Sequence, residues 1–258
     1  MPFIDVGELK MYYALTGSRE PVLILSNSLG TDFSLWDPQM AELQQRFRIL
    51  RYDTRGHGKS SATPGDYTIE QLGRDLLALL DSLGLDRVHF CGLSMGGMIG
   101  MWLGIHAPDR LNRLVLSNTA ARIGTKEGWN ARIATVKKDG MKSVSSAVVE
   151  RWFTSGFRAS SPEKVAQAQR VLEQTPPEGY AACCAAIRDM DQRDAVAQIK
   201  VPTLVIYGGS DSVIPLSDAH FLTEQIKGAK ELELPAAHLS NIEQSVAFTQ
   251  AVSNFLSQ

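Results

Sequence analysis

Ser94 stands between two glycines, Gly92 and Gly96, in the stretch FCGLSMGGMIG. A serine hydroxyl becomes a useful nucleophile when a neighbouring base accepts its proton and when the oxygen is held where a substrate can reach it. A sharp turn from a strand into a helix would hold it in this way, and the flanking glycines would let strand and helix approach closely. The stretch therefore predicts either a catalytic serine or a site of tight packing.

Asp211 and His238 are the residues that favour catalysis. Asp211 stands in GGSDSVIP and His238 in AAHLSN, and each directly follows an apolar run that predicts a strand. In an open α/β sheet the carboxyl ends of parallel strands meet at one edge, so both residues would lie near Ser94. The chain order serine, acid, histidine also suits this motif. We therefore predict Ser94 as nucleophile, Asp211 as orienting acid and His238 as general base.

Other residues of the same types leave alternatives open. Asp211 would also suit a cap of the helix expected after Pro215, and Asp86 and Asp218 are further candidates for the acid. The remaining histidines fall in an expected turn, strand or helix, where packing or solvation is the ordinary role; they are His57, His89, His106 and His220.

Two backbone amides are predicted to stabilise the negative charge on a carbonyl oxygen under attack. The amide of Met95 would lie at the N-terminus of the helix after Ser94, where the helix dipole reinforces it. The second donor is expected from the loop SNSLG, in which the amide of Leu29 is the best candidate.

Strands and helices alternate along most of the chain. Apolar runs between turn residues predict strands at 3–6, 10–16, 22–27, 48–52, 88–93, 113–117, 201–208 and 231–234. The segment YTIEQLGRDLLALLDSLG predicts a helix from apolar residues at steps of three and four, with Thr68 and Gln71 at its start and Gly84 at its end. This alternation predicts an α/β fold with a mostly parallel central sheet covered by helices on both faces.

The alternation stops between residues 120 and 198, where the pattern is helical and is interrupted by glycines and prolines. We expect these residues to form an inserted helical cap on a core made of residues 1–119 and 199–258. One amphipathic helix is expected at 242–256.

The composition favours a small-molecule partner. The 26 basic and 28 acidic residues give a net charge of −2, without the basic excess that nucleic acid or anionic lipid would need. The start MPFIDVGELK lacks the pattern of a secretory signal, and no run approaches the roughly 18 apolar residues of a membrane span. The three cysteines lack metal-ligand spacing, and we expect free thiols in a cytoplasmic protein.

Longer motifs make the chain resemble a known family. The stretches DTRGHGKS and GLSMGG, the aspartate of GGSDSVIP and the histidine of AAHLSN resemble the α/β-hydrolases. A narrower resemblance is to the 3-oxoadipate enol-lactonases of the β-ketoadipate pathway, and it rests on SNSLGTD, LSNTAARIGT, RWFTSGF, GYAACCAAIRDMDQR and AAHLSNIEQ. Asn27 and Ser28 precede Leu29, where many α/β-hydrolases have His-Gly; this departure agrees with the narrower group.

The resemblance implies hydrolysis of an enol-lactone bearing a carboxymethyl group to 3-oxoadipate, by a Ser-His-Asp mechanism that requires no metal or other cofactor. The free carboxylate of that substrate needs a partner inside an apolar pocket, and arginine suits it best. The expected cap offers arginines for this carboxylate and tryptophans for apolar walls, and the sequence does not choose among them: Arg122, Arg132, Arg151, Arg188, Trp129 and Trp152.

Rival functions stay open at this stage. A carboxylesterase, a carbon–carbon bond hydrolase or a cofactor-free perhydrolase would have the same fold and the same three residues. Epoxide hydrolases and haloalkane dehalogenases fit less well, because they have an aspartate at the position of Ser94. A ligand receptor that keeps the three residues without turnover is the rival from another class. The oligomeric state does not follow from the sequence.

Overall fold

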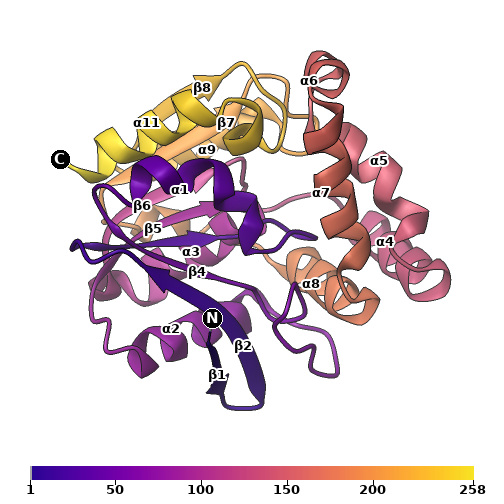
Figure 1. The fold of residues 1–258 in the computed structure, drawn as a ribbon, viewed down its shortest axis with the longest axis horizontal. Helices are drawn as coiled ribbons and strands as arrows, with labels where there is room; N and C mark the ends of the chain where they lie inside the picture. The colour runs from indigo at the N-terminus through magenta and orange to yellow at the C-terminus, as the bar shows by residue number, and fades with distance from the viewer. Residues whose placement is uncertain (1) are drawn as a thin grey trace.

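An eight-stranded sheet runs through residues 2–258 in the order β1-β2-β4-β3-β5-β6-β7-β8 (Figure 1). A computed structural model describes these residues; Met1, the first residue of the expected core, lies outside them. β1, β2 and β4 pair antiparallel, and the other neighbours are parallel, which confirms the predicted sheet. The strands are β1 Phe3–Val6, β2 Leu9–Thr16, β3 Val22–Ser26, β4 Arg48–Tyr52, β5 Val88–Leu93, β6 Leu111–Ser117, β7 Thr203–Gly208 and β8 Lys230–Leu234.

The central strands are buried on both faces. β3, β5 and β7 are buried along their whole lengths, as their apolar runs predict for strands covered by helices on each side. β5 and β6 are parallel neighbours, and their last residues, Leu93 and Ser117, are paired in register. The residues that follow these two strands therefore start side by side at the same edge of the sheet.

Helices cover both faces of the sheet. α1 (Asp37–Leu43) packs beside α11 (Ser245–Leu256), whereas α2 (Ile69–Ser82) packs beside α3 (Met95–His106) on the other face (Figure 1). α9 (Leu216–Gln225) packs on β7. Among residues 2–258, no helix has both the length and the apolar character needed to cross a membrane.

The predicted ends of α2 are confirmed. The Thr68 hydroxyl accepts a hydrogen bond from the Gln71 amide at 3.0 Å, and this satisfies one of the free amides of the first turn. Gly84, beyond the last turn, has a φ of +64°, which glycine adopts without steric cost.

Residues 33–43 form two short helices that the sequence patterns did not predict. A 3-10 helix, Phe33–Trp36, leads directly into α1. The Asp32 carboxylate accepts from the Ser34 amide at 2.9 Å, and Pro38 lies in the first turn of α1. These capping signals were present, but each helix is too short to show a periodicity.

The helix predicted at 242–256 is present over most of its length, but it is divided at Gln244. The chain forms α10 (Ser240–Glu243) and then α11, with Gln244 between them outside helical geometry. The Glu243 carboxylate accepts from the Ala237 amide at 3.1 Å, which ties this turn to the loop after β8. The tertiary contact interrupts a pattern that is continuous in sequence.

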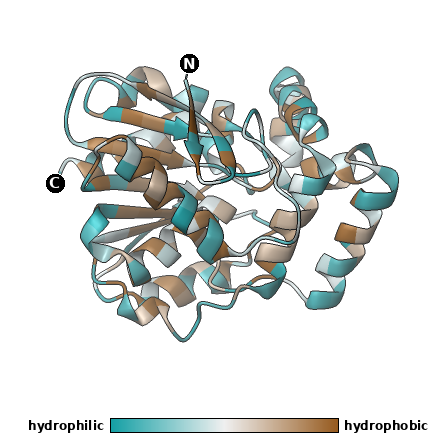
Figure 2. Cartoon of the chain, turned by 90° about the horizontal axis from the view of Figure 1, so that it is seen from below, coloured by the Kyte–Doolittle hydropathy of each residue, from teal (hydrophilic) through white to brown (hydrophobic). Residues whose placement is uncertain are grey.

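Five α-helices lie between β6 and β7, in the segment 120–198, which we call the helical insertion. Figure 1 shows them gathered at one end of the sheet, and Figure 2 shows largely hydrophilic outer surfaces on these helices. They are α4 Lys126–Asp139, α5 Lys142–Trp152, α6 Ser155–Ser160, α7 Pro162–Gln174 and α8 Pro177–Asp189, followed by a 3-10 helix, Val196–Gln198.

The helical insertion meets the rest of the molecule backbone to backbone at two glycines. A Cβ on Gly179, in α8, would lie 2.2 Å from the Gly56 carbonyl oxygen, and a Cβ on Gly56 would lie 2.6 Å from the Gly179 Cα. Glycine is therefore needed at both positions. Beside this contact the Cys183 thiol donates to the Arg55 carbonyl at 3.7 Å.

Candidate active site

Ser94 occupies a strained turn between β5 and α3. Its φ is +57° and its ψ is −115°, a conformation that a residue with a side chain rarely adopts. A Cβ on Gly92 would lie 2.2 Å from the Gly96 carbonyl oxygen, and a Cβ on Gly96 would lie 2.2 Å from the Ser26 carbonyl oxygen. Both glycines are therefore needed for packing, and that packing holds Ser94 in the strained turn.

Asp211 and His238 come together from the loops after β7 and β8. Their side chains are almost fully buried, and the His238 Nδ1 lies 2.8 Å from the Asp211 Oδ2. The other Asp211 oxygen accepts from the amides of Val213 at 2.7 Å and Ile214 at 3.0 Å. Burial alone would raise the pKa of Asp211, but His238 and the hydrogen bonds outweigh it and lower that pKa. An ionised Asp211 can hold the imidazole in one orientation.

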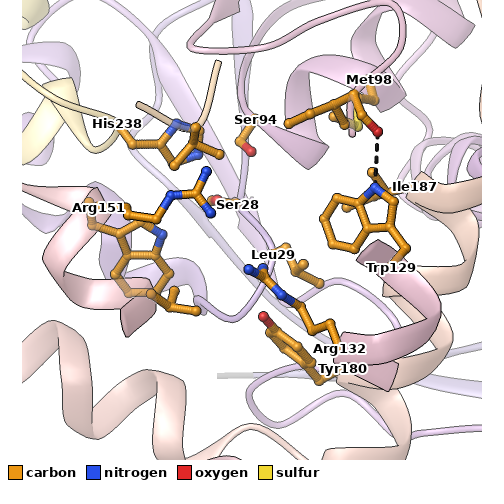
Figure 3. Close-up of a pocket in the computed structure, with 14 residues that line it drawn as sticks. Ser28, Leu29, Ser94, Met98, Trp129, Arg132, Arg151, Tyr180, Ile187 and His238 are labelled. Carbon is orange, nitrogen blue, oxygen red and sulfur yellow. Dashed lines mark hydrogen bonds between the residues drawn. The ribbon is translucent and has the colours of Figure 1, made fainter. Parts of the chain in front are cut away.

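Ser94 and His238 line the same cavity (Figure 3). No hydrogen bond joins the Ser94 hydroxyl to the His238 ring among the described residues, and such bonds are often loose before substrate binds. We call Ser94, Asp211 and His238 the strand-end triad. Ser94 and His238, which are more than a hundred positions apart in sequence, thus line one cavity, as the predicted order of strands implied.

The loop that carries Leu29 lies beside this cavity. Ser28 and Leu29 line it, and the Gly30 amide donates to the His57 Nε2 at 2.9 Å. Burial lowers the pKa of His57 to about 4, so this ring is neutral at neutral pH and its Nε2 can accept. Met95 is the first residue of α3, where the amide has no partner within the helix. The geometry is compatible with oxyanion binding by the amides of Leu29 and Met95.

His57 is a residue whose contact the sequence did not reveal. It lies in the turn RGHGKS, and no motif or spacing connects that turn to the loop 26–30. By accepting from Gly30 it fixes the residue next to Leu29.

Two arginines of the helical insertion point into the cavity, Arg132 from α4 and Arg151 from α5 (Figure 3). Among residues 2–258 neither forms an ion pair with a carboxylate. Arg151 donates to the Ser212 carbonyl at 3.0 Å, and burial and then the charge of Arg132 lower its pKa. Trp129, Trp152 and Tyr180 supply apolar surface around them. The cavity is therefore lined by two cations that have no ion-paired carboxylate among the described residues.

The other two candidate arginines lie outside the cavity. Arg188 forms ion pairs with Asp189 at 2.6 Å and with Asp66 at 3.3 Å, so the structure does not bring it near Ser94. Arg122 lines a separate outer hollow and lies 3.9 Å from Asp191.

The outer hollow adjoins the cavity, and both are lined by Trp129, Arg132 and Arg151. The inner cavity has a volume of about 40 Å³ and the outer hollow about 660 Å³. The inner space holds only a few water molecules. A larger ligand that reaches Ser94 must therefore also occupy part of the hollow, beside the two arginines.

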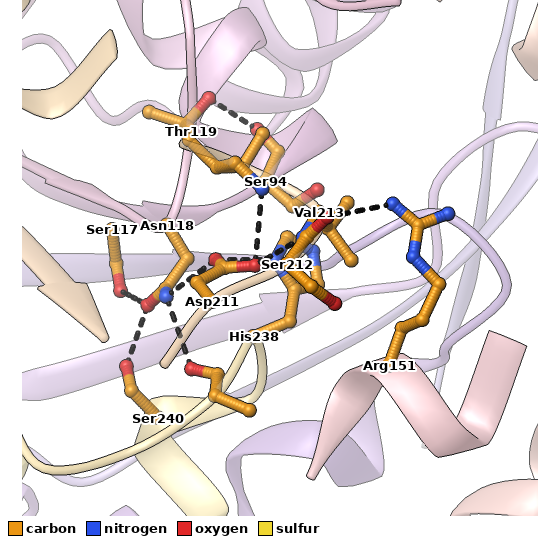
Figure 4. Close-up of polar contacts among 12 residues, drawn as sticks. Ser94, Ser117, Asn118, Thr119, Arg151, Asp211, Ser212, Val213, His238 and Ser240 are labelled. Carbon is orange, nitrogen blue, oxygen red and sulfur yellow. Dashed lines mark hydrogen bonds and ion pairs between the residues drawn. The ribbon is translucent and has the colours of Figure 1, made fainter. Parts of the chain in front are cut away.

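Asn118, directly after β6, was not predicted as a site residue. Its side-chain amide donates to the Asp211 Oδ2 at 2.9 Å (Figure 4). The only sequence signal was its place at the end of a central strand beside the one that carries Ser94.

No group of three or more histidine, cysteine, aspartate or glutamate side chains in the described part of the chain is arranged to hold a metal ion.

Comparisons with known proteins agree with this geometry. A family model described as the alpha/beta hydrolase fold matches residues 21–245. The 3-oxoadipate enol-lactonase 2 of Acinetobacter baylyi is 44% identical over 250 residues, which are 96% of this chain and 94% of that protein. The 3-oxoadipate enol-lactonase 1 of the same organism is 39% identical over 236 residues, or 92% and 88% of the two chains. The crystal structure of the enol-lactonase from Burkholderia xenovorans LB400 matches with a TM-score of 0.98 and 45% identity, over 100% of both chains.

Proposed function

The chain belongs to the α/β-hydrolase family, and from this premise we propose that it hydrolyses 3-oxoadipate enol-lactone to 3-oxoadipate, a step of the β-ketoadipate pathway. One observation carries the proposal beyond the family. Two arginines without acidic partners line the cavity that contains Ser94, so this cavity suits an ester that carries its own negative charge. The identity of 44% and 45% to enol-lactonases, over nearly the whole chain, supports the same substrate.

We propose that Ser94 attacks the lactone carbonyl while His238 accepts the hydroxyl proton. Asp211 orients the imidazole and stabilises its positive charge. The carbonyl oxygen becomes an oxyanion that accepts from the amides of Leu29 and Met95. Collapse of this intermediate breaks the bond between the acyl carbon and the ring oxygen, and His238 returns its proton to that oxygen.

The released group is an enol that stays attached to the acyl chain. Its conversion to the ketone disfavours reclosure of the ring. Water, deprotonated by His238, then attacks the ester of Ser94, and the proton passes back to the serine oxygen. The product leaves with two carboxylates, one of them newly formed.

We propose Arg132 and Arg151 as the partners of the substrate carboxylate. A guanidinium offers two parallel N–H donors to a carboxylate, and a partly dry cavity strengthens the pair. Trp129 and Trp152 would form the apolar walls on either side of the lactone ring. Arg122 lines only the outer hollow and faces Asp191, and Arg188 lies outside both spaces and pairs with Asp66 and Asp189.

We further propose a division of labour between two parts of the chain. Residues 1–119 and 199–258 form the core that carries the chemistry, and residues 120–198 form a cap that selects the substrate. A cytoplasmic location is supported by the three cysteines, which are free and buried, as expected in a reducing compartment.

A competition between two substrates tests the function. Purified protein is given the enol-lactone, generated in place from its precursor, and in parallel a short-chain aryl ester without charge. Rapid loss of the lactone absorbance with feeble ester hydrolysis supports the proposal. The reverse ranking points to a general carboxylesterase, and binding without turnover of either compound points to a receptor.

A further inference from the structure

The turn after β6 contacts Ser94 on both sides of its backbone. The Ser94 amide donates to the Ser117 carbonyl at 2.8 Å, and the Thr119 hydroxyl donates to the Ser94 carbonyl at 2.7 Å. Ser117 and Thr119 are buried, so these bonds are protected from water. The strained conformation of Ser94 is thus held by two residues that flank Asn118.

The Asn118 side chain reaches Asp211 and the loop that carries His238 (Figure 4). Its Nδ2 donates to the Asp211 Oδ2 at 2.9 Å and to the carbonyl of Ala237, the residue before His238, at 3.3 Å. Its Oδ1 accepts from the hydroxyls of Ser117 at 2.9 Å and Ser240 at 2.6 Å. Both donors and both lone pairs of the amide are therefore used.

Asn118 is itself strained. Its φ is +45°, and within residues 2–258 only Ser94 shares this left-handed region among residues other than glycine. Its amide donates to the Ile206 carbonyl of β7 at 2.8 Å, so the turn is fixed to the strand that leads to Asp211. Strain of this kind persists where surrounding contacts determine the conformation, and it concentrates at functional sites.

We propose that Asn118 is a positioning residue that sets the distance between the nucleophile and the acid–base pair. Its backbone neighbours hold Ser94, and its side chain holds Asp211 and the loop of His238. One residue thereby joins three loops that only the fold brings together. Asn118 has this role only if the strand-end triad acts as proposed above, whichever ester is the substrate.

Replacing Asn118 with aspartate tests whether this residue positions the acid–base pair or only fills space in the core. Below the pH at which it ionises, the introduced carboxyl group can donate to Asp211 as the amide does. Above that pH two buried carboxylates face each other and repel, and such pairs share a proton well into the range where a lone carboxyl is ionised. The groups that face the new carboxyl are Asp211 and His238, with Arg151 beyond Ser212 and Glu243 beyond Ala237.

The expected result is a reversed pH profile. In the wild type kcat should rise with pH as the general base loses its proton, whereas in Asn118→Asp it should fall by about tenfold or more over the same range. The variants Asn118→Ala and Asn118→Gly should each lose about 10- to 100-fold in kcat at every pH. The glycine variant is included because glycine tolerates the positive φ at this position. KM should change little in all three, because Asn118 does not line the cavity.

Asn241→Asp is the matched control. Asn241 is equally buried, and its side chain donates to the Leu35 carbonyl at 2.9 Å, without a contact to Asp211. This variant introduces a buried carboxylate next to the same region, so it should lose stability but keep a wild-type shape of the pH profile.

The assays use the neutral aryl ester as well as the lactone, and thermal unfolding is measured for every variant. If the wild type hydrolyses the ester but not the lactone, the proposed substrate fails while the test of Asn118 remains valid. A wild-type pH profile in Asn118→Asp, or folded Ala and Gly variants within threefold of wild-type kcat, would overturn the inference. Loss of cooperative unfolding in all three variants would also overturn it, since Asn118 would then serve the stability of the fold.

Discussion

The strand ends and the helical insertion lie on two sides of the same cavity. They differ in whether their polar groups have partners within the protein. At the strand ends every side-chain oxygen and nitrogen of Asp211 and Asn118 has a protein partner, so these two side chains are held in place without substrate. On the insertion side Arg132 and Arg151 have no carboxylate partner among the described residues. Under the proposed function, the first side would be preorganised for a reaction common to many esters, and the second would be completed by an anionic ligand.

The largest expected effect lies at the strand ends. Ser94→Ala removes the nucleophile, so turnover of both the lactone and the neutral ester should fall about 10⁶-fold. The unfolding midpoint should move by less than about 3 °C, because one buried hydroxyl is removed without a change of packing. Absorbance assays and thermal unfolding measure the two quantities. Substantial residual turnover would remove Ser94 from its role.

Substitutions on the insertion side should lower turnover of the lactone and leave turnover of the neutral ester almost unchanged. Arg132→Met and Arg151→Met each remove a cation that faces the ligand, so kcat/KM for the lactone should fall about 100-fold. Turnover of the neutral ester should change by less than about threefold, since that substrate has no carboxylate to pair. Arg188→Met, outside the cavity, is the control and should leave both substrates unaffected. Equal losses for both substrates would mean that the arginines support structure and not recognition.

Protonation of His57 should make the free energy of unfolding depend on pH. The pKa of His57 is about 4 in the folded protein and about 6.5 when unfolded, so the unfolded chain binds more protons between these values. The free energy of unfolding should therefore fall as pH drops from 6.5 towards 4, by about 3 kcal/mol in total. Burial raises the pKa of Asp53 to about 6, which opposes this trend over part of the range.

His57→Gln isolates the contribution of the histidine, because Asp53 is present in both proteins and glutamine can still accept from Gly30. Urea unfolding at several pH values should show the wild type losing about 3 kcal/mol more than the variant on acidification. Parallel curves for the two proteins would show that His57 does not titrate in this way.

The smallest expected effect concerns the contact between Gly179 of the helical insertion and Gly56. Gly179→Ala would force α8 away from Gly56 and should destabilise the protein by about 1–3 kcal/mol. Lactone turnover should fall more than ester turnover, since the arginines would shift relative to Ser94. Gly156→Ala is the matched control, because a Cβ there meets no atom within 4 Å and a helical alanine adds slight stability. The same loss in both variants would contradict a specific role for the glycine contact.

The sequence predicted the strand ends well because their signals are local. Apolar runs located the strands, and the rule that parallel strands share a carboxyl edge brought Asp211 and His238 to Ser94. Glycines around Ser94 could be assigned to a close approach because the motif requires one. Each inference used residues within a few positions of the site residue.

The insertion side was not predictable to the same degree. Whether Arg132 or Arg188 faces the cavity depends on how α4 and α8 pack together, and no short-range pattern encodes that. Asn118 escaped notice because an isolated asparagine after a strand has no periodicity or motif. The break at Gln244 follows from the contact of Glu243 with Ala237, which becomes visible only in three dimensions.

β6 and β7 are adjacent parallel strands, so the helical insertion begins after the carboxyl end of β6 and leads back to the amino end of β7, at the opposite edge of the sheet. The insertion is therefore part of a crossover connection, and its helices can be lengthened, shortened or exchanged only if the connection still joins these two strand ends. Ser94, Asp211 and His238 lie outside this segment, which contacts their loops through the Trp152 carbonyl, an acceptor from the Leu239 amide at 3.0 Å, and through Arg151, a donor to the Ser212 carbonyl. If these two contacts are kept, we expect changes within residues 120–198 to alter substrate choice before they alter bond cleavage.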